Sequence, residues 1–457
     1  MPSCGDALAR AIAQASAEGV PPLLEAGTHL TKPGRNPSIE IGANGLRMGS
    51  VSRADDHMGP AIVARPDSGL DPKRPDFNHG LSLVPSRPTA AEIDAVVWKT
   101  HQTTPKDPPF EFGVILRGDV EITDLTMDCN MGAQGLAALD PHAAEHSSML
   151  AFAGQGYNVA PSPAGVRRTV FVGFKSVTVK NVHTTRGGFA DDIWFTRGYF
   201  TPNIDNVIIE HVTDSDRVSP RRATIGFSAL CQNIKIHATD VYNLHLEDSG
   251  ETYDHQPRAS DVFQPSSWTL ADVTAQLMVF NAKGKTYTID ATNVTVTTAF
   301  TVVQAGGTIR NSTLRIGQGT RLDRMNNFTF DCVTWHLVPD AAGNVFGFKP
   351  VSKFTTECSV SFHNNQFLVD GTARGGSLVT SDLSVNTEDR TKDPGNRVTV
   401  SLIGCSYPEP FGRSAAMPIA AARERGSWTF ARGDFGDRKT DTAVQKGAAP
   451  EIVVKFI

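Results

Sequence analysis

The feature that most constrains the fold of this chain is a short strand pattern that recurs from about residue 118 to residue 430. In each copy apolar residues alternate with polar ones, which is typical of a strand with one buried and one wet face. Val177 and Val207 lie 30 residues apart, and Ile309 and Phe330 lie 21 apart. Short strands at this period, without long helices between them, predict a β-solenoid. Copies stand at residues 119–125, 176–182, 206–212, 233–239, 287–294, 308–314, 327–333 and 359–365.

An amphipathic helix is predicted over residues 5–19, because Leu8, Ile12 and Ala15 share a face and Gly19 stops the helix. Such a helix can cover the open end of a solenoid and protect its strand edges. We expect one continuous domain, since solenoids grow one turn of chain at a time. Its predicted parts are an N-terminal cap at 1–32, a solenoid at 33–404 with long loops at 33–110, 131–168 and 243–275, and a last coil with a C-terminal cap at 405–457.

Composition limits the partners that this chain can have. Of its 457 residues 40% are hydrophobic and 20% charged, and the net charge is −5. Nucleic acid is not an expected partner, because phosphate contacts need clustered Lys and Arg. No apolar run is long enough for a membrane span, so no membrane partner is expected. The six cysteines lie far apart without a CxxC pair, which indicates free, buried thiols rather than disulfides or a zinc site.

The location of the protein is left open by its first residues. Met1 to Asp6 lead directly into the predicted helix, and no secretory signal is visible. Either the protein is not exported by that route, or the sequence was trimmed and the protein is extracellular or virion-associated.

Several motifs resemble the pectate-lyase-like superfamily of single-stranded right-handed β-helix proteins, over nearly the whole chain. The segment from Asp6 to His29 is similar to the cap helix and first strand of that superfamily, and residues 122–130 resemble one of its common coils. Asp191-Asp-Ile-Trp, Arg221-Arg-Ala-Thr-Ile-Gly-Phe and Asp261-Val-Phe-Gln-Pro resemble the series "G-D-G-I", "R-R-x-G-I" and "I-D-I-E-P" of bacterial and phage proteins that act on polysaccharides. The resemblance implies a right-handed parallel β-helix with an N-terminal capping helix and a polysaccharide or oligosaccharide as partner. Many of these relatives bundle three rods, so a homotrimer is also a candidate assembly.

Candidate site residues gather in that central block. If Ile193 and Phe195 point inward, Asp192 and Trp194 face water. Arg222 one coil on, the Asp261 region and His146 would then share a wet stripe within about 15 Å, because parallel strands stack about 4.8 Å apart. Their structural alternatives, which stay open, are solvated turn acids for the aspartates and a coil-fixing salt bridge for Arg222.

A pair of carboxylates on neighbouring strands suits glycoside hydrolysis, with a separation near 5 Å for retention and about 6.5 to 9.5 Å for inversion. The segment 243–256 is dense in His and acidic residues and can hang over the same groove, although a polar surface loop is the alternative. Gln264 stands where the resemblance has a Glu, which puts that acid's role in doubt here. The catalytic candidates are Asp192, Asp261, Glu247 and Asp191, and the substrate-binding candidates are Arg222, Trp194, His146, Gln264 and His245.

Three functions fit these residues. The first is a glycoside hydrolase with paired carboxylates. The second is a lyase for a uronic-acid polymer, which needs a cation over the sugar carboxylate and a base such as His146 or Arg222. The third is a non-catalytic glycan-binding rod. No cofactor is expected, and calcium held by Asp191, Asp192 and an acid of a neighbouring coil is the one metal site left open.

Overall fold

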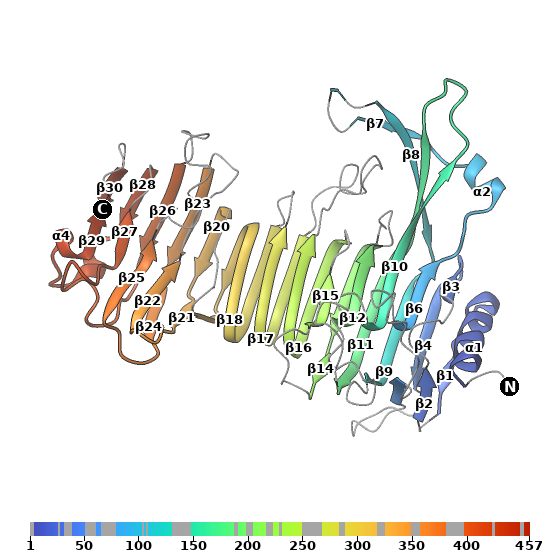
Figure 1. The fold of residues 1–457 in the computed structure, drawn as a ribbon, viewed down its shortest axis with the longest axis horizontal. Helices are drawn as coiled ribbons and strands as arrows, with labels where there is room; N and C mark the ends of the chain where they lie inside the picture. The colour runs from blue at the N-terminus through green and yellow to red at the C-terminus, as the bar shows by residue number, and fades with distance from the viewer. Residues whose placement is uncertain are drawn as a thin grey trace. The chain divides into compact units, whose positions relative to one another are not determined.

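The structure of the protein is a computed structural model. It describes residues 4–25, 28–31, 39–50, 61–64, 79–102, 105–106, 108–129, 148–186, 191–197, 204–215, 223–227, 231–248, 267–282, 288–317, 325–348, 357–380, 397–422, 426–447 and 452–457. These residues form mainly β-strands in long parallel stacks, with few helices (Figure 1). The prediction of an all-β, solenoid-like chain is confirmed at this level.

The chain divides into two compact units, Met1–Ser266 and Ser267–Ile457. Within the described ranges no helix is long and apolar enough to cross a membrane.

The elements of the first unit begin with a helix and continue as strands, interrupted by one short second helix. They are α1 (Cys4–Glu18), β1 (Leu23–Leu24), β2 (Thr28–Thr31), β3 (Ile39–Ile41), β4 (Leu46–Ser50), β5 (Ala61–Ala64), β6 (His79–Pro85), α2 (Ala90–Asp94), β7 (Lys99–His101), β8 (Phe110–Arg117), β9 (Val120–Asp128), β10 (Ser148–Val159), β11 (Arg168–Thr185), β12 (Asp191–Arg197), β13 (Ile204–Glu210), β14 (Thr213–Asp214), β15 (Ala223–Phe227) and β16 (Cys231–Asp248).

The second unit begins with two long strands and ends in shorter ones. Its elements are β17 (Ser267–Ala282), β18 (Thr288–Arg310), β19 (Thr313–Ile316), β20 (Met325–Asp331), β21 (Thr334–Leu337), β22 (Asn344–Phe348), β23 (Glu357–His363), β24 (Gln366–Val369), β25 (Gly375–Thr380), β26 (Arg397–Ile403), β27 (Ala420–Ala422), β28 (Gly426–Phe430), a 3₁₀ turn (Arg432–Phe435), α4 (Thr440–Ala443), β29 (Val444–Lys446) and β30 (Ile452–Phe456).

Helix α1 lies beside β2, β3 and β4, as the predicted N-terminal cap requires (Figure 1). Ile12 is fully buried, and the buried Ser16 donates its hydroxyl proton to the carbonyl oxygen of Gly45 at 2.7 Å. Gly19 follows the helix with φ +69°, a left-handed conformation that ends helices and that glycine adopts without strain. The predicted helix and its end are confirmed, but it begins one residue earlier, and of the predicted face only Ile12 is buried, together with Ala9 and Ser16.

Parallel register brings apolar side chains of successive strands into line inside the first unit. In the stack of β9, β11, β13 and β16, one buried row consists of Val120, Val177, Val207 and Ile234. A second stack holds β6, β10, β12, β15 and the end of β16. There the rings of Phe152 and Phe195 stack at 5.0 Å and those of Phe195 and Phe227 at 4.4 Å.

A left-handed corner recurs where each strand of a stack turns into the next segment. Asn181 has φ 51° and Asn311 φ 50°, a conformation in which Asn and Asp are enriched. Asn181 donates its side-chain amide to Asp124 Oδ1 at 3.0 Å, in the strand below. Both residues therefore stand at the turns, and Asn181 bridges two neighbouring strands there. The same corner is occupied by Asp124, His211 and Ala238 in the first unit and by Asp272, Asn293, Cys332, Asn364 and Gly404 in the second.

Two of the three predicted loops hold strands. The segment 33–110 contains β3 to β7 and α2, and the segment 131–168 contains β10. From 243 to 275 the described residues belong to the end of β16 and the start of β17. These segments carry little periodic pattern because several of their strands are short or buried on both faces; residues 148–154 of β10 are all buried.

Several elements of the first unit form a projection that we call the arm (Figure 1). The arm consists of α2, β7, β8 and the antiparallel pair made by residues 155–159 and 168–172. Phe110, Phe112 and Phe171 form its apolar cluster. The Arg168 guanidinium lies over the Trp98 ring at 4.7 Å and its Nε contacts Glu111 Oε2 at 2.5 Å.

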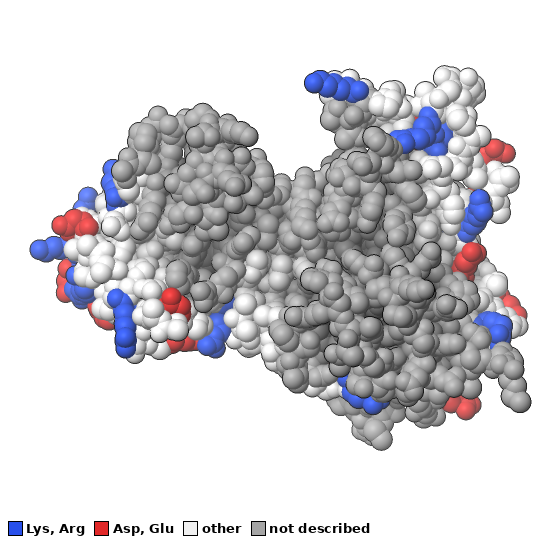
Figure 2. Space-filling model, viewed as in Figure 1, with Lys and Arg blue, Asp and Glu red and all other residues white. Residues whose placement is uncertain are grey.

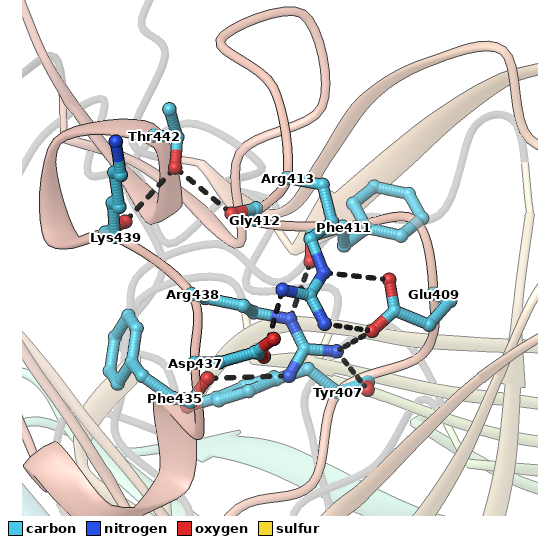
Figure 3. Close-up of polar contacts among 10 residues, drawn as sticks. All are labelled: Tyr407, Glu409, Phe411, Gly412, Arg413, Phe435, Asp437, Arg438, Lys439 and Thr442. Carbon is cyan, nitrogen blue, oxygen red and sulfur yellow. Dashed lines mark hydrogen bonds and ion pairs between the residues drawn. The ribbon is translucent and has the colours of Figure 1, made fainter.

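The C-terminal segment of the second unit, predicted as an irregular cap, is organised by two arginines (Figure 3). Arg438 donates to the carbonyl oxygens of Phe411 at 2.8 Å and Tyr407 at 3.0 Å, and to Glu409 Oε1 at 3.0 Å. Arg413 pairs with Glu409 at 3.1 Å and with Asp437 at 2.8 Å. Each charge of this network faces an opposite one, so its part in the molecule is to fix the irregular chain.

Candidate functional site

A stripe of side chains on the outer face of the second stack carries two of the predicted site residues, Trp194 and His245. The register aligns Ala151, Trp194, Gly226 and His245 on β10, β12, β15 and β16. Their neighbours Ile193, Ile225 and Leu244 form the buried row beside them. Strand alternation therefore puts Trp194, Gly226 and His245 on the opposite face, with neighbouring Cα atoms about 4.8 Å apart.

The carboxyl group of Asp191 occupies the space in which a side chain at position 226 would lie. A Cβ atom built on Gly226 would overlap all three atoms of that carboxyl group. Asp191 is half-buried, and so is His245. The structure thus gathers a carboxylate, an indole and an imidazole around one glycine, and the absence of a side chain at Gly226 is what makes room for the acid.

Asp192 does not face water, and this expectation from the sequence is wrong. Its side chain is fully buried, and the thiol of Cys129 donates to its Oδ1 at 3.3 Å. Trp194, also expected on the wet face, is only 6% exposed. Residues 192–195 are all buried, so both faces of this strand are covered and alternation does not predict which of its side chains face water. The wet carboxylate of this strand is Asp191.

A second buried carboxylate lies one strand away and was not predicted. Asp214 is 4% exposed, and the fully buried Thr224 donates its hydroxyl proton to Asp214 Oδ2 at 2.6 Å. The backbone N–H of Tyr242 donates to the Thr224 hydroxyl at 3.2 Å. Thr224 is thus part of a polar interior. The sequence Thr-Asp at 213–214 did not indicate a buried acid, because the same two residues are common in solvated turns.

Several predicted site residues cannot be placed. Asp261, Gln264, Arg222 and His146 lie outside the described residues. Glu247 lies in β16, two residues after His245, but its side chain is not among those described. Among the described residues no group of three or more His, Cys, Asp or Glu side chains is arranged to hold a metal ion. Of the four cysteines whose side chains are described, none forms a disulfide; three are buried, whereas Cys332 is exposed, contrary to expectation.

The second unit carries a polar triad that sequence reasoning missed. His336 Nδ1 lies 2.8 Å from Asp370 Oδ1, and the other oxygen of Asp370 lies 3.2 Å from Arg315 Nη2. Arg315 and His336 are register neighbours on β19 and β21. His336 is 33% exposed, so this carboxylate holds a solvent-accessible imidazole by one nitrogen. The signal was available in principle, since Arg315 and His336 occupy equivalent outward positions of two successive repeats.

Charges of both signs occur on the described part of the face in Figure 2. On the face in Figure 2 the Lys and Arg side chains are interspersed with Asp and Glu. The outward Lys180 of β11 illustrates this, because it pairs with Glu210 at 3.0 Å and its hydrogen bond lowers the pKa of that carboxyl. Comparisons of the chain with protein-family models, with curated proteins and with solved structures found no match.

Proposed function

We propose that this chain is a right-handed parallel β-helix that cleaves glycosidic bonds of a polysaccharide or oligosaccharide, as a glycoside hydrolase. The observation that carries the proposal is the Asp191 carboxyl group over Gly226, with Trp194 and His245 as register neighbours on either side. A long row of stacked strands suits a long polymer. The proposal keeps the idea of paired carboxylates but replaces the buried Asp192 by Asp191.

The second carboxylate in this proposal is Glu247. Gly226 is the register partner of His245, and Glu247 follows two residues later on the same strand. A strand rises about 3.3 Å per residue and neighbouring strands lie about 4.8 Å apart, so the Cα atoms of Gly226 and Glu247 are about 8 Å apart. The proposal takes the inverting form, in which the two carboxyl groups stand about 6.5 to 9.5 Å apart and leave room for a water molecule between them.

The roles follow from that geometry. Asp191 takes a proton from the water whose oxygen attacks the anomeric carbon, while the bond from that carbon to the leaving oxygen breaks. Glu247 donates its proton to the leaving oxygen. His245 is the positioning residue beside Asp191, and Trp194 forms the apolar floor next to the acid. Arg222, His146, Gln264 and Asp261 remain proposed substrate contacts or acids on the same stripe.

The experiment is a screen of neutral and acidic polysaccharides for new reducing ends, followed by variants on the substrate found. We expect Asp191→Asn to lower turnover by at least about 100-fold with unchanged folding, because a general acid or base typically contributes 10²–10⁴-fold. Asp441→Asn, an exposed acid of α4 in the second unit, is the matched control and should retain full activity. Wild-type turnover in Asp191→Asn would remove this site.

A lyase is the second candidate, and the triad of Arg315, His336 and Asp370 favours it. Arg315 offers a cation for the carboxylate of a uronic acid, and His336 offers a base held by Asp370. In such an elimination His336 takes the proton next to the sugar carboxylate, a carbon–carbon double bond forms as the bond to the leaving oxygen breaks, and the imidazolium returns the proton to that oxygen. The unsaturated product absorbs in the ultraviolet, so a product that absorbs and disappears in His336→Gln would replace the hydrolase proposal. Binding of a glycan without any product would favour a non-catalytic rod.

A further inference from the structure

The arm of the first unit contains a cavity of about 480 Å³ that no part of the proposed glycan site uses. Such a volume lies within the usual range of small-molecule sites, about 300–1,000 Å³. Its wall is mainly apolar, with one acidic and one basic side chain. The lining residues are Glu92, Ala95, Val96, Val97, Lys99, Phe112, Gly113, Val114 and Ile115.

The cavity exists because β7 covers only part of its partner strand. Its residues Lys99 to His101 pair with Phe112 to Phe110 of β8, and the ladder goes no further among the described residues. Before β7, the chain crosses residues 113–115 without joining the sheet. Val96 lies directly on Gly113, where an added Cβ atom would overlap its Cγ1. An overhanging segment thus faces an open strand edge, which supplies backbone hydrogen-bonding groups to the cavity.

The other wall is held in place by ionic contacts. Thr89 caps α2, and its backbone N–H donates to Glu92 Oε2 at 2.8 Å. The buried Arg117 donates to Glu92 Oε1 at 2.5 Å and to the carbonyl oxygen of Ser86 at 2.9 Å. These bonds anchor the short helix to β8 and to the segment before it. The cavity is therefore preformed, which reduces the conformational cost of binding.

Its two charged residues are not equivalent toward a ligand. The oxygens of Glu92 are already engaged by Arg117 and Thr89, and these bonds lower the pKa of Glu92 to about 2. Lys99 is exposed at the edge of the cavity, and no ion pair of its ammonium group occurs among the described residues. Val97 beside it is 79% exposed and offers an apolar surface at the edge of the cavity. The available charge is positive and the available surface is apolar.

We propose that this cavity binds a small amphipathic anion, with an apolar ring or short acyl chain inside and one carboxylate on Lys99. The apolar part would contact Val97, Val114 and Ile115. This site is separate from the residues proposed for glycan cleavage, and it stands whether or not that activity is found.

The experiment is calorimetric titration of the full chain with octanoate, octylammonium and octanol, three probes of equal length and different charge. We expect octanoate to bind at one site and at least about tenfold more tightly than octylammonium. The reason is that a hydrogen-bonded charge pair between the octanoate carboxylate and Lys99 contributes about a factor of ten in affinity or more. Lys99→Ala should weaken octanoate at least about tenfold and leave octanol unchanged.

Two variants separate this cavity from general apolar binding. Val97→Asp places a negative charge at the cavity on an exposed position and should abolish octanoate binding without affecting folding. Val453→Asp makes the same change at a 46% exposed valine of the second unit and should bind octanoate like the wild type. Equal affinity for octanoate and octylammonium, no saturable binding, or unchanged binding in Val97→Asp would each overturn the proposal.

Discussion

The two units of this chain build their interiors from different chemistry. In the first unit the buried residues include Arg117, Asp128, Asp192 and Asp214, whereas no charged residue is buried among those described in the second. The second unit instead contains all three fully buried tryptophans, Trp268, Trp335 and Trp428. Buried charges lower stability unless they are paired, so their confinement to the first unit indicates a constraint other than packing there. The proposed catalytic stripe lies in that same unit, beside those acids.

The largest expected effect tests the aromatic interior of the second unit. Phe330 is fully buried, and its ring lies 4.8 Å from Phe328, 4.8 Å from Trp335 and 5.4 Å from Phe362. Phe330→Ala should lower the free energy of unfolding of this unit by about 3–5 kcal/mol, as core aromatic truncations do. Denaturant titration measures this loss. Ile457→Ala, at a 69% exposed position, should change it by less than about 0.5 kcal/mol.

The next effect tests whether the buried polar side chains of the first unit stabilise one another. Asp214→Ala should destabilise by about 1–3 kcal/mol, because the buried Thr224 hydroxyl loses its acceptor at 2.6 Å. The double variant Asp214→Leu with Thr224→Val removes both side-chain partners and should recover only part of that loss, because the backbone N–H of Tyr242 then lacks its acceptor. Denaturation of the singles and the double forms a cycle. Strictly additive losses would mean that the bond between them contributes nothing.

A smaller change in stability is expected when a half-buried ion pair is removed, and this change can be compared with the removal of an exposed ion pair. Glu92 has a folded pKa near 2, below its value of 4.5 in the absence of interactions, because Arg117 and Thr89 stabilise the ionised form. Its contribution is therefore complete above about pH 4.5 and is lost as the pH falls through 2. Glu92→Gln should cost about 1 kcal/mol at neutral pH after allowance for solvent screening, and the difference from wild type should vanish in acid.

Glu409→Gln in the C-terminal network is the control for that experiment. Glu409 is exposed, although its bonds with Arg413 and Arg438 also lower its pKa. We expect little change in thermal stability, and what change there is should disappear in high salt. A larger loss at Glu409 than at Glu92 would reverse the order that we assign to the two units.

The smallest effect concerns the recurring corner. Ala238 has φ 46°, whereas the corresponding corners of the second unit hold Asn, Asp, Cys or Gly. A left-handed conformation costs a non-glycine residue about 1–2 kcal/mol, and a glycine avoids this cost. Part of the resulting gain in stability is lost, because glycine raises the conformational entropy of the unfolded chain. Ala238→Gly should therefore raise stability by a few tenths to about 1 kcal/mol in a thermal melt. Ala13→Gly in α1 should instead lower it, because glycine is a poor helix former.

The repeating part of the fold could be predicted from the sequence, because alternation and corner residues are local signals. Val177 and Val207 fell into one buried row as the period required, and Asn181 is a corner residue. The arm could not be predicted in this way. Residues 148–154 are buried without alternation, so their strand carries no period of two.

For the candidate site, the sequence predicted which residues take part better than it predicted how they are arranged. Asp191, Trp194 and His245 were all candidates, and parallel register aligns Trp194 and His245 with the glycine under the Asp191 carboxyl group. Asp192 was expected to be exposed, but residues 192–195 are all buried, so both faces of its strand are covered. Trp194 is nearly buried although its position is outward, and its register neighbours Ala151 and Gly226 are both small. Alternation gives the direction of a side chain but not what covers it.

The missing side chain at Gly226 couples the residue types at positions 191 and 226, which are 35 residues apart in the chain, so the two should change together in evolution. As long as residue 191 keeps its carboxylate, even alanine at 226 competes with it for the same space. A chain that loses the acid becomes free to accept a side chain there. Among descendants of this sequence, glycine at 226 should therefore persist where the acid persists and drift where it is lost. That pairing would distinguish chains that keep the proposed site from those that keep only the fold.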